Sequence, residues 1–321
     1  DALFKIQGAY SLVILTNKKL IGVRDPYGIR PLVLGDLNGA PVLTSETCAL
    51  DIIGAKYVRD VEHGEIIIIS EDGMESIKPF PKVQERPCIF ERIYFSRPDS
   101  IVGGKTVYTY RKSLGQELAK ENNIDADVII PVPDSGVPAA LGYSQESKIP
   151  FELGIIRNHY VGRTFIEPSQ SIRQFGVKLK HNANSSYIEN KKVILIDDSI
   201  VRGTTAKKII KMVYDAGAKE VHLGIACPPI KHPDFYGIDT PDYNELIAAK
   251  SSLEEINNVI GSKSIFFLSL EGTYKAMGYE KRDNETPQFT DHCFTGDYPT
   301  SLLDREQGTV SKQFSLLSEK N

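Results

Sequence analysis

The stretch VILIDDSIVRGTT, residues 193–205, constrains the fold of this 321-residue chain more than any other. Its first four residues are apolar and mostly β-branched, which is typical of a buried strand in a parallel sheet. Asp197 and Asp198, the acid pair, follow where that strand should end, and a helical pattern begins soon after Thr205. Because ligands bind beyond the carboxyl ends of strands in open α/β sheets, the loop between strand and helix is placed to hold one.

The loop and the first turn of the helix carry small, hydroxyl and basic residues. They are Ser199, Arg202, Gly203, Thr204 and Thr205. Free backbone N–H groups at the start of a helix bind anions, most naturally a phosphate. The acid pair repels phosphate but suits sugar hydroxyls or a hydrated Mg2+. The combination predicts a site for a phosphorylated sugar; the alternative is an αβ turn whose loop stays empty.

These residues resemble the signature of type I phosphoribosyltransferases, which bind phosphoribosyl pyrophosphate (PRPP). Together with NHYVGRTFI at 158–166, the chain resembles more narrowly the amidophosphoribosyltransferase family, whose members open purine synthesis with glutamine as nitrogen donor. The resemblance implies transfer of ammonia to PRPP, giving 5-phosphoribosylamine and pyrophosphate. It implies that the acid pair fixes the ribose hydroxyls, with Asp197, Asp198 and Arg163 as the catalytic residues and Mg2+ as the cofactor.

The wider sequence predicts an α/β protein in which a doubly wound parallel sheet follows a β-rich region. Strand and helix patterns alternate from about residue 127, which predicts parallel strands with right-handed crossovers. Residues 1–79 are β-rich, with a hairpin over 9–25 and a tight turn at Asn38-Gly39. Proline-rich residues 79–87 read as a linker. We therefore divide the chain into residues 1–79, a transferase domain at 80–303 and a polar tail at 304–321.

The β-rich region resembles the late part of a class II glutaminase domain, an αββα fold with an N-terminal nucleophile. The segments that carry this resemblance are RDPYGIRPLVLG, TSETCALD and VRDVEHGEIIII. In that family a cysteine at the mature N-terminus attacks glutamine, with its own α-amine as base. The sequence begins at Asp1, and none of its cysteines stands at a terminus. We expect a truncated domain without glutaminase activity.

A second loop should lie on the same rim as the acid pair. Pro133, Asp134, Ser135 and Gly136 end one strand and open the next helix. The resemblance implies that their backbone amides hold the pyrophosphate of PRPP; the alternative is a plain helix cap. Many members of the family carry serine where Gly136 stands, which leaves Ser135 as the nearby hydroxyl that could reach a magnesium ion.

Residues 157–182 form a long connection rich in Arg, Lys and Gly. Such a length within a compact domain is typical of a functional lid or of disorder, and its charge suits closure over a polyanion. The alternative is a solvated basic loop. The resemblance implies that this lid contacts PRPP and completes an ammonia tunnel. The implied contacts are Tyr160, Gly162, Arg163 and Thr164.

Cysteine usage indicates neither a disulfide framework nor a zinc site. The four cysteines, Cys48, Cys88, Cys227 and Cys293, form no CxxC pair. Some family members bind a [4Fe–4S] cluster, and Cys88 and Cys293 stand in matching contexts. Asp234 and Thr290 occupy the other two ligand positions, so we expect no cluster, which ordinarily takes four cysteines.

Composition and charge exclude some classes of binding partner, and two alternative functions remain. A net charge of -4 argues against bulk nucleic-acid binding, and no apolar run reaches the roughly 20 residues of a membrane span. We expect a cytoplasmic enzyme and a homo-oligomer, although no feature of the sequence gives the oligomeric state. The alternatives are a base-adding phosphoribosyltransferase, in which the β-rich region has no place, and a non-catalytic PRPP-sensing regulator. The GGKT segment at 103–106 resembles the end of a Walker A loop but lacks the preceding strand.

Overall fold

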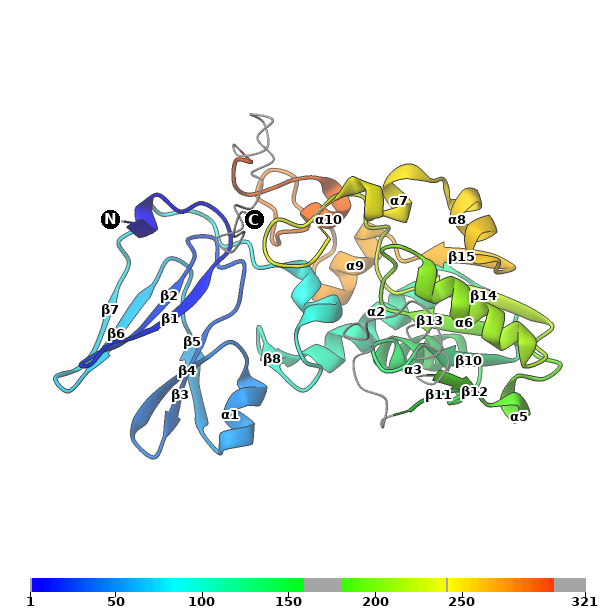
Figure 1. The fold of residues 1–321 in the computed structure, drawn as a ribbon, viewed down its shortest axis with the longest axis horizontal. Helices are drawn as coiled ribbons and strands as arrows, with labels where there is room; N and C mark the ends of the chain where they lie inside the picture. Colours follow the sequence, from blue (N-terminus) through cyan, green and yellow to red (C-terminus); the bar gives the residue numbers. More distant parts are fainter. Residues whose placement is uncertain (1, 159–180, 241, 303–321) are drawn as a thin grey trace, which may run out of the picture.

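The computed structural model describes residues 2–158, 181–240 and 242–302. Figure 1 shows a β-rich N-terminal part, labelled β1 to β7 with α1, beside an α/β part that carries the labels from α2 onward. The predicted tail at 304–321 lies outside the described residues.

The N-terminal part contains two antiparallel sheets, a short 3-10 helix at Ala2–Phe4 and one short α-helix. The sheets have the strand orders β1-β2-β6-β7 and β4-β3-β5. Both predicted turns are confirmed: β1 pairs with β2 as a hairpin, and Asn38 and Gly39 join β3 to β4 with φ of 56° and 91°. The elements are β1 (Ser11–Leu15), β2 (Leu20–Arg24), β3 (Val33–Leu37), β4 (Ala40–Thr44), α1 (Thr47–Ile53), β5 (Lys56–Asp60), β6 (Ile66–Ser70) and β7 (Gly73–Ile77).

The α/β part is built on a parallel sheet, as predicted. Its strands run in the order β10-β13-β14-β15, and every neighbouring pair is parallel. The central strand buries Val193, Ile194, Leu195 and Ile196 completely, which is why its sequence is uniformly apolar. The strands are β10 (Val128–Pro131), β13 (Lys192–Asp197), β14 (Glu220–Ile225) and β15 (Ser264–Phe267).

The path of the chain places a topological switch point between β10 and β13. Ile129 on β10 pairs with Ile194 of β13 on one side and makes a parallel bridge to Phe151 on the other. The chain therefore leaves β10 toward Phe151 and later returns on the opposite side to form β13. Ligands of doubly wound sheets bind at such a reversal, outside the carboxyl ends of the strands.

Helices pack on this sheet and on one another. Helix α3 packs against β10 and β13, α6 against β14 and α8 against β15, while α2 packs on α3 and α9. Their bounds are α2 (Val107–Glu121), α3 (Val137–Ser147), α6 (Thr204–Asp215), α8 (Leu253–Ile260) and α9 (Leu270–Met277). Two-residue strands β8 (Ile101–Val102) and β9 (Lys105–Thr106) form a hairpin over the GGKT segment, not a phosphate loop. Within the described residues, no helix is long and apolar enough to span a membrane.

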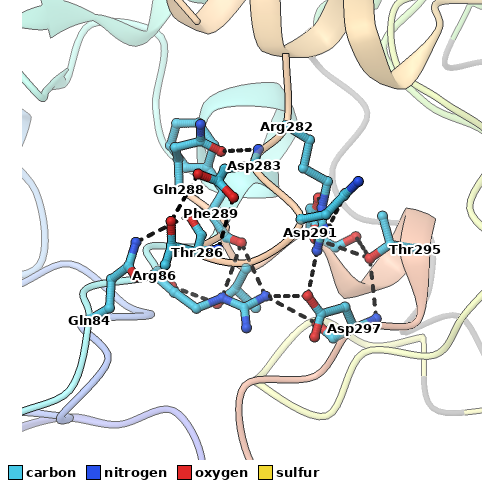
Figure 2. Close-up of polar contacts among 12 residues, drawn as sticks. Gln84, Arg86, Arg282, Asp283, Thr286, Gln288, Phe289, Asp291, Thr295 and Asp297 are labelled. Atoms are coloured by element: carbon cyan, nitrogen blue, oxygen red, sulfur yellow. Dashed lines mark hydrogen bonds and ion pairs between the residues drawn. The ribbon is translucent and has the colours of Figure 1, made fainter.

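The linker between the two parts is fastened to the end of the described chain. The backbone carbonyl of Arg86 accepts a hydrogen bond from the Thr290 hydroxyl (2.6 Å), and the Arg86 guanidinium pairs with Asp297 at 3.0 Å. Arg282 also pairs with Asp297, so this one carboxylate joins two cations, as Figure 2 shows. The sequence predicted the linker but not this attachment.

Candidate functional site

The acid pair stands at the carboxyl end of the central strand. Asp197 is the last residue of β13, and its backbone carbonyl still accepts a ladder bond from Ala226 N–H at 2.9 Å. Asp198 is only 6% exposed, and its carboxylate accepts a hydrogen bond from the Ser199 hydroxyl at 2.6 Å. The Asp198 N–H donates to the Asp197 carboxylate at 2.9 Å. Both carboxylates are thus held by the turn that ends the strand.

The two acids repel each other. Burial and the neighbouring charge of Asp198 raise the pKa of Asp197 well above its ordinary value. Among the described residues, no basic side chain forms an ion pair with either acid. No group of three His, Cys, Asp or Glu side chains there could hold a metal ion. A divalent cation at this place would therefore use two carboxylates and complete its shell with substrate oxygens and water, which suits Mg2+.

The first turn of α6 presents free backbone amides beside the acid pair. Its N-cap, Gly203, has φ of 74° and offers no side-chain cap, and Thr204 and Thr205 are exposed. The unsatisfied N–H groups and the helix dipole together favour an anion. A side chain at 203 would be strained by the positive φ and would approach Ile247 at 3.1 Å, so glycine is required there.

Arg202, a predicted substrate contact, is engaged elsewhere in this structure. Its guanidinium pairs with Glu245, and the neighbouring Val201 carbonyl accepts a hydrogen bond from Ile247 N–H at 2.9 Å. The segment 245–247 thus contacts and stabilises the loop between β13 and α6. No local signal in the sequence pointed to Glu245, because it lies 43 residues beyond its partner.

The loop 133–136 lies next to the acid pair, as predicted. It follows β10, and Val132 N–H donates to the carbonyl of Ile196 on β13 at 2.8 Å. The peptide bond between Pro133 and Asp134 is cis. Gly136 caps α3 without a side-chain hydrogen bond, but its own N–H donates to the Val132 carbonyl, Val137 N–H donates to that of Asp134, and Pro138 has no N–H. Among the described residues, the amides left to bind an anion at this helix start are those of Ser135 and Ala139. The exposed Asp134 carboxylate pairs with Arg157, while Ser135 is half-buried.

Gly136 is required by close approach to the central strand. A Cβ added there would lie 2.3 Å from the Ile196 carbonyl oxygen and 2.9 Å from that of Val132, both backbone atoms. The serine that many family members carry at this position does not fit this backbone arrangement.

Replacing Gly136 by alanine should force β10 and β13 apart at their carboxyl ends. We expect Gly136→Ala to lower the free energy of unfolding by about 1–3 kcal/mol, the usual cost of overpacking. Urea denaturation would measure the loss, with Ser135→Ala as the neighbouring control that adds no atom. An unchanged midpoint for Gly136→Ala would show that the strands separate without cost.

Four predicted contacts fall outside the described residues. They are Tyr160, Gly162, Arg163 and Thr164. The ends of their connection are described: β11 (Ile155–Arg157) pairs antiparallel with β12 (His181–Ala183), and Arg157 stands opposite His181. The connection therefore leaves and re-enters the fold at one place, and Arg157 at its start reaches Asp134 of the loop 133–136.

The positions at which some family members bind a cluster are occupied by other interactions. Cys88 forms a backbone bridge with Thr290, whose hydroxyl is committed to the Arg86 carbonyl. The Asp234 carboxylate lies 3.0 Å from Nε2 of His292. Burial raises the pKa of the Cys88 thiol to about 11, and burial likewise raises that of Cys293. Of the four positions, two carry cysteine and the other two carry an acid and a threonine, whereas such a cluster ordinarily takes four cysteines.

Both parts of the chain are similar to known proteins. Residues 110–244 match the family model of the phosphoribosyl transferase domain. An amidophosphoribosyltransferase of Rhizobium etli is 59% identical over 99% of this chain, which covers 65% of that relative. The Bacillus subtilis amidophosphoribosyltransferase is 48% identical over 94% of the chain and 63% of its own length. The solved B. subtilis glutamine PRPP amidotransferase, complexed with ADP and GMP, superimposes with a TM-score of 0.86 over 94% of this chain and 66% of that one.

The α/β part is thus a phosphoribosyltransferase domain with the type I fold. Over nearly its whole length, N-terminal part included, the chain is homologous to the amidophosphoribosyltransferases. It spans 65% of the length of its R. etli relative.

Proposed function

We propose that this chain transfers ammonia to PRPP, giving 5-phosphoribosylamine and pyrophosphate, with glutamine as the nitrogen source in the whole protein. This is the first step of purine biosynthesis. The observation that carries the proposal is the grouping at the switch point: two uncapped helix N-termini lie on either side of an acid pair. That grouping matches a sugar with a phosphate at one end and a pyrophosphate at the other. We assign residues 1–79 to a class II glutaminase domain and 80–303 to the transferase domain.

Each element has a separate task in binding PRPP. The first turn of α6, with the hydroxyls of Thr204 and Thr205, holds the 5-phosphate. The acid pair accepts hydrogen bonds from the ribose hydroxyls. The Asp198 N–H fixes the direction of the Asp197 carboxylate, and the Ser199 hydroxyl fixes that of Asp198. The loop 133–136 holds the pyrophosphate, with the Ser135 amide as the donor, because Gly136 N–H already donates to the Val132 carbonyl. No protein nucleophile is required, because ammonia itself attacks the anomeric carbon.

The charges of the site fit the bond that breaks. As the bond to pyrophosphate lengthens, positive charge grows on the ribose ring beside the acid pair, and negative charge grows on the leaving group beside the N-terminus of α3. Mg2+ held by Asp197 and Asp198 would supply the further positive charge that stabilises the leaving pyrophosphate. We assign Arg163 the same task from the lid, which would also exclude water from a site where ammonia must attack. We propose that no [4Fe–4S] cluster is present.

Pyrophosphate release tests this function directly. The purified chain, supplied with PRPP and Mg2+, should release pyrophosphate only when NH4Cl is added, and Asp198→Asn should not. Tight binding of PRPP without turnover would favour a PRPP-sensing regulator. Release that does not depend on ammonia would indicate a hydrolase and contradict the proposal.

A further inference from the structure

We propose that Glu46 and Thr47 of the N-terminal part are positioning residues for the loop 133–136, and that they act through helices α2 and α3. The inference deepens the proposed function and rests on it, because it takes the loop to be the pyrophosphate site. It assigns the N-terminal part a mechanical role in the transferase reaction, distinct from any chemistry on glutamine.

The first step is a set of hydrogen bonds between the start of α1 and the turn at residues 96–101. One carboxylate oxygen of Glu46 accepts hydrogen bonds from Arg97 N–H (2.8 Å) and from the Ser100 hydroxyl (2.7 Å). The Thr47 hydroxyl oxygen accepts a third bond from Ile101 N–H at 2.8 Å. Thr47 is 5% exposed and Ser100 is fully buried, so the bonds that these two hydroxyls make are partly shielded from water. Two adjacent residues at the start of α1 thus hold both ends of the turn.

The second step joins residues 96–101 to the first turns of α2. The carbonyls of Pro98 and Ser100 accept hydrogen bonds from Tyr108 and Val107 N–H, each at 2.8 Å. The buried guanidinium of Arg111, one turn further along α2, donates to the Ser96 carbonyl at 2.6 Å. The turn therefore caps α2, and a displacement of the turn displaces the start of the helix.

The third step is direct contact between the backbones of α2 and α3. A Cβ added to Gly115 on α2 would lie 1.8 Å from the carbonyl oxygen of Ala139, and one added to Gly142 on α3 would lie 1.9 Å from that of Lys112. No side chain separates the helices at either place. Because close-packed backbones have little compressibility, the two helices should move together.

The last step leads from α3 into the site. Helix α3 starts at Val137, directly after the loop 133–136, and Gly136 N–H donates to the Val132 carbonyl at 3.0 Å. On its other side, Gly136 touches the backbone of β13 just before the acid pair. A shift of α3 would therefore move the loop amides relative to Asp197, which is fixed in the sheet. Substitution of Glu46 should therefore weaken the contacts that the loop makes with a ligand. It should leave the ligand contacts of β13 and α6 unchanged.

Two small ligands separate these contacts. Inorganic pyrophosphate with Mg2+ engages the loop, while ribose 5-phosphate engages the acid pair and α6 without reaching the loop. Glu46→Ala should weaken pyrophosphate binding by about three- to tenfold, the size of effect typical of mutations along a coupled network. Binding of ribose 5-phosphate should change by less than about twofold, since a separate site carries no coupling.

Isothermal titration of the full chain with each ligand tests the proposal. Glu62→Ala is the matched control, because Glu62 pairs with Lys78 at the surface of the same N-terminal part. Thr47→Val should repeat the effect of Glu46→Ala, and Thr47→Ser, which keeps the hydroxyl, should restore binding; this pair decides the matter if Glu46→Ala does not fold. Equal weakening of both ligands, or unchanged pyrophosphate binding, would overturn the inference. Failure of the unmodified chain to bind either ligand would instead remove the proposed function.

Discussion

Asp198→Asn should abolish most PRPP turnover while leaving the protein as stable as before, or more so. We expect activity to fall about a hundredfold to a thousandfold, the usual effect of removing one charged group aimed at the reacting centre. Asp197→Asn should act in the same way, because both carboxylates face the ribose in the proposed function. Rates of ammonia-dependent pyrophosphate release at saturating PRPP would measure the loss.

The thermal stability of Asp198→Asn shows whether the acid pair serves function or supports the fold. The pKa of Asp197 is raised in the folded state by burial and by Asp198, so folding is favoured below its ordinary pKa and loses that contribution as pH rises through the raised value. At pH 7 the pair therefore opposes folding, and neutralising Asp198 should hold or raise the thermal midpoint. Asp215→Asn, which removes an exposed acid paired with Lys211, is the control. A large fall in the midpoint of Asp198→Asn would mean that the acids support the fold.

Asp291→Asn should cause the largest loss of stability that we predict. Asp291 is fully buried and accepts hydrogen bonds from Arg282 at 2.7 Å and from the Tyr274 hydroxyl at 2.9 Å. Removing its charge leaves the nearly buried Arg282 paired with one acid, the half-exposed Asp297, beside a neutral contact with Asn284. Figure 2 shows Arg282 between Asp291 and Asp297. Breaking one partner of a buried pair costs about 3–5 kcal/mol, and we expect a value near the lower end because Asp297 remains.

Urea denaturation would measure that loss as a change in the free energy of unfolding. Lys211→Gln is the matched control, since it breaks an exposed pair with Asp215 that should be worth about 0.3–0.5 kcal/mol. Because the Asp291 network also holds Thr295 and, through Asp297, the linker residue Arg86, the variant should expose the linker to proteases. A loss no greater than that of the control would show that the network does not fasten the linker.

The sequence predicted the elements whose signal is local. The apolar run before Asp197 and the periodic pattern after Thr205 depend only on neighbours along the chain, and both elements are confirmed within two residues of their expected ends. The hairpin over 9–25 has the same kind of signal. The parallel sheet followed from the alternation of such elements.

The unpredicted features depend on contacts between distant residues. Glu46 meets Arg97 across 51 positions, and Thr290 meets Arg86 across 204, so no window of sequence contains both partners. The fit of Gly136 against Ile196 depends on the register of two strands, which residue types alone do not set. The acid pair was found because both acids are adjacent, whereas Glu245 was missed because only the fold brings it to Arg202.

A crystal structure of this chain with Mg2+ and PRPP would test the central claim most directly. The account predicts the 5-phosphate on the first amides of α6, the ribose hydroxyls on Asp197 and Asp198, and the pyrophosphate on the loop 133–136 with the Ser135 amide as donor. PRPP bound away from the switch point between β10 and β13, or bound there with the acid pair out of reach of the ribose, would contradict it.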